Sequence, residues 1–146
     1  MIALLQRVAR ARVSVENASL ADISSGLLLL VSVVRDDQPD DALRLADRVA
    51  GYRVFADDAG KMNLDVQQAG GQILAVPQFT LAADTNRGRR PSFGGAAPPE
   101  RGKALFDTFC EQLGHKNLTV KRGEFGANMQ VELVNDGPVT FWLSTR

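Results

Sequence analysis

The chain has 146 residues, which is enough to bury a substantial core and most simply forms one domain over residues 1–146. Its 17 Lys and Arg residues balance its 17 Asp and Glu residues, so any contact with nucleic acid or a membrane has to be local. Its one Cys excludes an internal disulfide, and one His with one Cys cannot build a histidine-rich metal site or a zinc cluster.

The first half of the sequence predicts strands around one helix. Residues 1–17 indicate two strands, because apolar and polar side chains alternate there. The apolar run over residues 26–34 predicts a strand that is buried on both faces. Asp36 or Asp37 offers an N-cap for the following helix, with Pro39 near its first position. We expect a short strand over 52–55 and a loop over 56–63.

The second half predicts a long irregular segment, a second helix and three closing strands. A strand begins near residue 70 and meets Pro77, and residues 82–99 are rich in Gly, Pro and Arg. Pro98 and Pro99 can start a helix that ends at Gly114. The fold class is therefore predicted to be α+β, with a small β-barrel-like, mostly antiparallel sheet and two main helices. The closing strands are expected over 118–123, 129–135 and 139–145.

The N-terminal residues and the single Cys favour a cytoplasmic protein. The first 17 residues mix arginines with apolar residues and lack the pattern of a signal peptide. The longest apolar run is about half of what a membrane span needs. We therefore expect a cytoplasmic location and no membrane partner.

The usual nucleophiles and bases have plainer interpretations in this chain. Cys110 lies on the apolar stripe of the second helix, which favours a buried structural thiol over a nucleophile. His115 follows the glycine that ends that helix, where an exposed or end-capping role is favoured over general-base work. Candidate chemistry is thus left to the irregular segments.

Two irregular segments offer local binding groups, although each has a simpler alternative. Arg87, Arg89 and Arg90 stand beside a glycine in a loop, where they are either solvated or a clamp for phosphate. Thr80 and free backbone N–H groups at the end of the preceding strand are either an ordinary strand terminus or face a ligand. Taken alone, each segment favours the structural alternative.

The segment from Val134 to Phe141 combines a turn signal with a residue that conflicts with it. Asp136-Gly137 is a strong hairpin signal between two strand patterns. Pro138 has no N–H to donate to the strand it would open. A chain that only had to reverse direction would do better with another residue there.

Three stretches together resemble the D-aminoacyl-tRNA deacylase family, whose members proofread chirality. They are "MIALLQRV" at the start, "QFTLAADTNRGRRPSFGGAAPPE" in the middle and "FGANMQVELVNDGPVTFWL" near the end. "QFTL" and "NDGPVT" are the two signature motifs of the family, and both are present in the right order. The resemblance runs over essentially the whole chain without a large insertion.

The resemblance implies an activity and a homodimer, and it needs no cofactor or metal. The expected reaction is hydrolysis of the ester that joins a D-amino acid, or glycine, to the 3′-terminal ribose of tRNA, whose 3′ end is then the partner. The alternatives are a related deacylase that has a trans Gly-Pro bond and clears a mischarged L-aminoacyl-tRNA, and a catalytically silent protein that binds the tRNA end. Deacylation of D-Tyr-tRNA and L-Tyr-tRNA separates these three functions.

The same resemblance assigns roles to residues. It implies that Gly137-Pro138 has a cis peptide bond and enters the active site of the partner subunit, where its carbonyl oxygens meet the substrate's α-amino group and exclude an L side chain. Rejecting L while accepting D and glycine suits a rigid backbone wall.

On the catalytic side, the resemblance implies that the backbone of Gln78, Phe79 and Thr80 lines the pocket around the scissile carbonyl. Preorganised N–H groups there can stabilise an oxyanion, and the ribose 2′-hydroxyl can help activate water. Met129 is expected to line the pocket, with a core methionine as the alternative, and Arg7 to support the Gly-Pro loop, with a surface strand residue as the alternative.

Pro77 is a departure, because the family usually has serine before "QFTL". The change removes a hydroxyl and a backbone donor together. We expect it to stiffen the approach to Phe79 and Thr80 without removing a nucleophile, since no general base is evident to activate a serine there.

Overall fold

The computed structural model describes residues 1–146 and shows eight strands, two α-helices and one 3₁₀ helix. The helices are α1 (Pro39–Ala50), η1 (Phe79–Ala82, the 3₁₀ helix) and α2 (Pro99–Gly114). The strands are β1 (Ile2–Val15), β2 (Ala18–Ile23), β3 (Gly26–Ser32), β4 (Phe55–Ala56), β5 (Met62–Leu64), β6 (Gln72–Pro77), β7 (Val120–Arg122) and β8 (Met129–Ser144).

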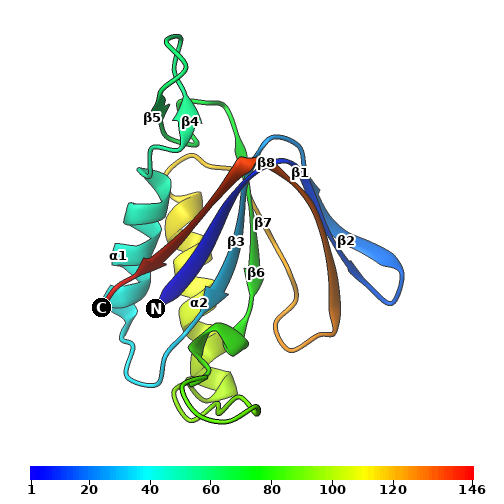
Figure 1. Cartoon of the computed structure of the whole chain (residues 1–146), viewed down its shortest axis with the longest axis vertical. Coiled ribbons are helices and arrows are strands. Elements are labelled where there is room, and N and C mark those ends of the chain that lie inside the picture. The colour runs from blue at the N-terminus through cyan, green and yellow to red at the C-terminus, as the bar shows by residue number, and fades with distance from the viewer.

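The main sheet is mixed, mostly antiparallel and barrel-like, as predicted. Its strands run in the order β2-β1-β3-β6-β7, and β8 pairs with the other edge of β1. The pairs of β1 with β2, β3 and β8 are antiparallel, whereas β3 with β6 and β6 with β7 are parallel. The long strands β1 and β8 bend away from the helices together with β2 (Figure 1). The short strands β4 and β5 form a separate hairpin that projects from the body.

Two hydrophobic clusters fill the two sides of this sheet. The larger has 24 buried residues and lies between the sheet and the helices α1 and α2, which pack side by side (Figure 1). The smaller has 7 buried residues from β1, β2, β3 and β6. Leu27 and Leu29 of β3 belong to the first cluster and Leu28 to the second, which confirms that this strand is buried on both faces. Neither helix is long and apolar enough to cross a membrane.

Two pairs of predicted strands are in fact single strands. Residues 2–15 form one strand that pairs with β8 along nearly its whole length, so the expected division of residues 1–17 was wrong. Residues 129–144 likewise form one strand, although the sequence indicated two with a turn between them. In both cases the shared partner keeps the chain extended past an interruption in the sequence pattern, because pairing continues on either side of it.

Helix α1 begins where the sequence predicted, but with a different cap. Pro39 is its first residue and Gln38 is its N-cap, so the expected caps at Asp36 or Asp37 were wrong. The Gln38 N–H donates to a carboxylate oxygen of Asp41 at 2.8 Å. This bond is the largest of the effects that hold the pKa of Asp41 below its usual value. Helix α2 begins at Pro99 and ends at Gly114, as predicted.

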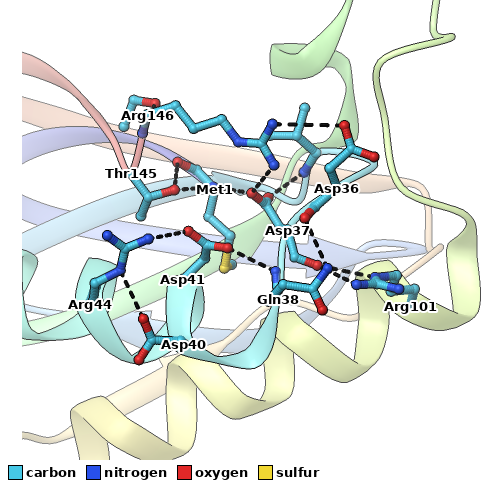
Figure 2. Close-up of polar contacts among 12 residues, drawn as sticks. Met1, Asp36, Asp37, Gln38, Asp40, Asp41, Arg44, Arg101, Thr145 and Arg146 are labelled. Carbon is cyan, nitrogen blue, oxygen red and sulfur yellow. Dashed lines mark hydrogen bonds and ion pairs between the residues drawn. The ribbon is translucent and has the colours of Figure 1, made fainter.

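Asp37 instead joins the two ends of the chain. Its fully buried carboxylate accepts hydrogen bonds from the Met1 ammonium at 2.7 Å and from the Val34 N–H at 2.6 Å, and the Arg146 guanidinium lies 3.3 Å away (Figure 2). Arg101 of α2 donates to the Asp37 carbonyl oxygen. A buried carboxylate is stable only with such partners, so Asp37 has an architectural role at this end of the sheet.

Candidate active site

A groove of about 660 Å³ opens where β6 ends. Its walls come from residues 76–79, from the segment 93–99 that leads into α2, and from residues 125–131 at the start of β8. Phe79, Phe93 and Phe125 contribute aromatic rings to these walls. A groove of this size and apolar character suits a small organic group, and polar contacts have to come from the backbone and a few side chains.

The segment of Gln78, Phe79 and Thr80 is held firmly at the edge of this groove. The Gln78 N–H donates to the Val31 carbonyl oxygen at 2.8 Å, and the buried Ser32 hydroxyl donates to the Phe79 carbonyl oxygen at 3.3 Å. The Gln78 side-chain amide also donates to the Thr80 hydroxyl. The segment therefore keeps its shape through contacts with the neighbouring strand β3.

The 3₁₀ helix that begins at Phe79 leaves backbone donors without helical partners. The N–H groups of the first helical residues, here Phe79 and Thr80, have no acceptor within the helix. Both residues are exposed. The arrangement can therefore present two neighbouring N–H groups to a ligand.

Pro77 occupies the last position of β6, beside this segment. It faces Val31 in the parallel ladder, and the ladder resumes with the Gln78 N–H. Pro77 lines the groove and packs beside Gly123, where an added Cβ would lie 3.3 Å from the proline ring. The proline thus fits the strand end without disturbing the residue that follows it.

Met129 combines the two roles that the sequence left open. It lines the groove and also packs against the smaller hydrophobic cluster. Its sulfur accepts a hydrogen bond from the Glu124 N–H at 3.3 Å. A Cβ at Gly123 would lie 2.9 Å from that sulfur, so a glycine is needed for the methionine to lie here.

Arg87, Arg89 and Arg90 lie on an exposed loop beside the groove. The loop is closed at its base by two hydrogen bonds between the backbones of Asp84 and Ser92, at 2.8 and 3.0 Å. None of the three arginines makes an ion pair or a side-chain hydrogen bond within the chain. The structure therefore leaves these cations free for an external anion.

The Arg7 side chain contacts the backbone beside the Gly-Pro segment and is not a free surface side chain. Its Nε donates to the Asp136 carbonyl oxygen at 3.0 Å, and its Nη1 donates to the Val54 carbonyl oxygen at 2.6 Å. The Gly137-Pro138 peptide bond is cis, and both residues are exposed. The structure thus brings Arg7 together with the Gly-Pro segment.

The Gly-Pro segment is an excursion within one strand, so the hairpin signal was misleading. Gln6 of β1 pairs with Thr140 of β8, and Val8 pairs with Asn135. Only Arg7 lies between the two pairs on β1, whereas residues 136–139 lie between them on β8 and form the excursion. The Asn135 side-chain amide donates to the carbonyl oxygens of Arg7 and Val139, at 2.9 and 3.0 Å, and so bridges the base of the excursion. Sequence reasoning missed Asn135, although its place directly before Asp-Gly-Pro was the available signal.

One chain does not bring its two candidate motifs together. Met129 lies in the groove, but the residues of the excursion do not line it. Pro138 follows Met129 on the same strand, at a distance of up to roughly 30 Å along an extended chain. In Figure 1 η1 and the start of β8 lie in the lower part of the view, whereas the middle of β8 passes β1 at the upper edge of the main sheet, below the hairpin of β4 and β5.

Cys110 is a buried thiol and His115 is exposed at the end of α2, as predicted, and neither residue lines the groove. Burial raises the pKa of the Cys110 thiol to about 12, so the thiol stays protonated and unreactive at neutral pH. His115 is exposed, and its N–H caps the end of α2. No three His, Cys, Asp or Glu side chains lie close enough together to hold a metal ion.

Comparison with known proteins gives consistent matches over nearly the whole chain. A family model described as D-Tyr-tRNA(Tyr) deacylase matches residues 4–144. The D-aminoacyl-tRNA deacylases of Salmonella newport (strain SL254) and Escherichia coli O139:H28 are each 57% identical over 143 residues, which cover 98% of this chain and 99% of each relative.

Solved structures match the same fold. A structure titled c-Myc DNA Unwinding Element Binding Protein has a TM-score of 0.94 and 35% identity, and the match covers 100% of this chain and 99% of the other. A protein described as a probable eukaryotic D-amino acid tRNA deacylase has a TM-score of 0.82 over 97% of each chain. At 16% identity, that second likeness shows the fold alone.

Proposed function

The chain belongs to the D-Tyr-tRNA(Tyr) deacylase family and is a D-aminoacyl-tRNA deacylase, an ester hydrolase; from this premise we propose that it works as a homodimer in which the Gly137-Pro138 excursion of one subunit enters the groove of the other. The observation that carries the proposal is that no residue of the excursion lines the groove of its own chain. A second copy related by a twofold axis completes both sites at once.

The surface of β8 supports such an assembly. β8 is an edge strand that pairs only with β1. Val134, Phe141 and Trp142 lie on either side of the excursion and are exposed, Trp142 by 53%. Exposed apolar side chains on an edge strand favour a partner that covers them. A second copy that binds there would bring its own β8 close to the excursion.

The excursion would act as the chiral filter. The carbonyl oxygens of Gly137 and Pro138 would accept hydrogen bonds from the substrate's α-amino group and fix the orientation of its Cα. The backbone wall would then stand where an L side chain has to lie, whereas a D side chain points away and glycine has none. Since the backbone wall would make no contact with a D side chain, tRNAs that carry D-amino acids of different size, or glycine, would be accepted.

The reaction would rely on the backbone of the 3₁₀ helix. A water oxygen attacks the ester carbonyl carbon, the bond from that carbon to the ribose oxygen breaks, and the ribose oxygen receives a proton. The N–H groups of Phe79 and Thr80 would stabilise the oxyanion, with the side chain of Gln78 fixing the segment. The vicinal 2′-hydroxyl of the substrate would help to activate the water, since no His or Cys side chain lines the groove.

The tRNA would meet the protein at its 3′ end. Arg87, Arg89 and Arg90 have no ion-pair partners in the chain, so they are free to contact phosphates next to the groove. Aminoacyl-tRNA is the substrate class that the family implies. We place this work in the cytoplasm, where aminoacyl-tRNA is made and used.

Deacylation of D-Tyr-tRNA, L-Tyr-tRNA and Gly-tRNA tests the specificity. We expect release from the D-tyrosyl and glycyl substrates and at least a hundredfold slower release from L-Tyr-tRNA. Preferred release of the L-amino acid would assign the chain to clearing a mischarged L-aminoacyl-tRNA. Binding of tRNA without release of any amino acid would instead indicate a silent tRNA-end binding protein.

Mixing two inactive variants tests the cross-subunit site. Gly137→Ala alters the excursion and leaves the groove intact, whereas Ala127→Trp fills the groove and leaves the excursion intact. If the excursion acts in the partner's groove, mixed dimers contain one complete site, and activity returns on mixing. If the excursion acts in its own subunit, no mixed dimer has a complete site and activity stays absent. Light scattering during size-exclusion chromatography reports the oligomeric state independently.

A further inference from the structure

The groove can hold only the very end of a tRNA. A volume of about 660 Å³ lies in the range of pockets that bind one small organic molecule, which here means an aminoacyl group with its terminal nucleoside. This step rests on the proposed function, because it assumes that the scissile ester lies beside Phe79 and Thr80. The nucleotide before the terminal adenosine then has to lie outside the groove, over its rim.

The rim carries two large aromatic side chains that are exposed. Phe79 is exposed by 56% and Phe93 by 42%, and their ring centroids lie 5.2 Å apart with the ring planes tilted by 57°. The chain has other exposed apolar residues, but only these two form an exposed aromatic pair beside a groove. An aromatic face in this position can stack with any base.

Positive charge without internal partners surrounds this pair. The loop that carries Arg87, Arg89 and Arg90 closes at Ser92, directly before Phe93. Arg35 lines the groove, is exposed, and also makes no ion pair or side-chain hydrogen bond within the chain. Asp84 is the acidic residue at the base of the loop, and it makes no ion pair with these arginines. One of its carboxylate oxygens instead accepts hydrogen bonds from the backbone N–H and the side-chain amide of Asn86, at 2.9 and 2.8 Å.

We infer that the exposed ring of Phe93, supported by Phe79, stacks on the base of the penultimate tRNA nucleotide, while the arginine loop and Arg35 contact the phosphates on either side of it. Aromatic side chains next to unpaired arginines are the combination that binds single-stranded nucleic acid without regard to sequence. This surface would therefore provide affinity for every tRNA, since all of them end in the same unpaired nucleotides.

Kinetics on two substrates test the inference. Phe93→Leu removes the aromatic face, and the matched control Phe93→Tyr keeps it. We expect Phe93→Leu to raise the KM for D-Tyr-tRNA at least fivefold, the lower end of the effect of losing one stacked base, with kcat changed by less than twofold. The minimal substrate D-tyrosyl-adenosine lacks the penultimate nucleotide but meets the same groove wall, so the fold increase in its KM should be at least fivefold smaller than the increase for D-Tyr-tRNA.

Salt dependence tests the arginines. Arg89→Gln should reduce the slope of log KM for D-Tyr-tRNA against log salt concentration by about 0.7, the value for one lost phosphate contact on a single strand. Arg12→Gln is the matched control, because Arg12 is also exposed and makes no ion pair but lies on β1 and does not line the groove, and it should leave the slope unchanged.

Several results would overturn the inference. An equal loss on D-Tyr-tRNA and D-tyrosyl-adenosine in Phe93→Leu would place the effect inside the groove, and an unchanged KM for D-Tyr-tRNA would exclude stacking. Binding of uncharged tRNA, followed by fluorescence, gives a readout that does not need hydrolysis. If the wild type released no amino acid, the proposed function would fail, whereas a fivefold weaker binding of tRNA by Phe93→Leu would still support the stacking surface.

Discussion

Replacing Gly137 by alanine is expected to leave the chain folded while removing most of its activity on D-aminoacyl-tRNA. Gly137 has a φ of +147°, a conformation that residues with a Cβ rarely adopt. A Cβ there would lie 2.6 Å from Val139 Cγ2 and 2.7 Å from the Val139 backbone nitrogen. The Val139 side chain can rotate, but its backbone nitrogen cannot move unless the excursion itself changes shape.

The size of the effect follows from this geometry. A residue with a Cβ in such a conformation costs about 1–3 kcal/mol. In a domain of this length, each kcal/mol corresponds to about 2–4 °C, so we expect the melting temperature to fall by roughly 2–12 °C and the fold to survive. A catalytic group that moves by about 1 Å can cost a hundredfold in rate, so kcat/KM for D-Tyr-tRNA should fall by about that factor.

Gly60 provides the matched control. It has a φ of +77° in the loop between β4 and β5, and a Cβ there would meet nothing within 4 Å. Gly60→Ala should therefore lower the melting temperature by a similar amount and leave deacylation unchanged. Differential scanning calorimetry and single-turnover deacylation, run on both variants, separate stability from activity. If Gly137→Ala kept the wild-type rate and the wild-type preference for D over L substrates, the excursion would not be the chiral filter.

Three further changes give independent tests. Pro77→Ser should change kcat on D-Tyr-tRNA by less than tenfold, and a gain of roughly a hundredfold, the size of one oxyanion donor, would show that the proline removes an essential group. Asn135→Ala removes two hydrogen bonds of about 0.5–1.5 kcal/mol each, so urea denaturation should show a loss of about 1–3 kcal/mol; an unchanged midpoint would mean that the excursion does not need this bridge. Asp41→Asn should lower stability at pH 7, and the loss should shrink as the pH falls below the unfolded pKa of about 4. The hydrogen bond from the Gln38 N–H and the contact with Arg44 lower the pKa of Asp41, so the stability that its carboxylate contributes is present above the unfolded pKa and is lost as the pH falls through the folded value. A stability difference that persisted in strong acid would contradict that account.

The elements with strong local signals were predictable from the sequence. The apolar run of β3 and the proline that opens α2 correspond to the observed elements, and the apolar stripe of α2 faces the core. The N-cap of α1 was displaced by one or two residues, because Asp37 is held by the chain termini and the cap position falls to Gln38. That contact joins residues more than thirty positions apart, and no local pattern reveals it.

The candidate site was predictable in its parts but not in its arrangement. The motif around Gln78 lies at the groove and the motif around Gly137 forms the excursion, with Met129 in the groove wall and Arg7 in contact with the excursion. Phe93 and Asn135 were missed, because an aromatic residue in an irregular loop and an amide before a turn signal have no distinctive spacing. Their contacts appear only when long-range pairing brings β1 beside β8 and the loop beside the groove.

The position of the excursion on β8 supports the proposal that the chiral filter comes from a second subunit. Both halves of β8 pair with the same strand, β1, so the ladder fixes the excursion relative to Met129 and prevents it from folding back towards its own groove. The side chains of Arg7 and Asn135 add hydrogen bonds at the base of the excursion, to the carbonyl oxygens of Asp136 and Arg7 respectively. A filter that rejects L-amino acids by steric contact has to be rigid, because a flexible wall would yield to an extra side chain. In this chain the ladder holds the excursion outside the chain's own groove, which is why we propose that the filter acts in a second subunit. On this reasoning, a monomeric variant should lose chiral selection even where its fold and its groove remain intact.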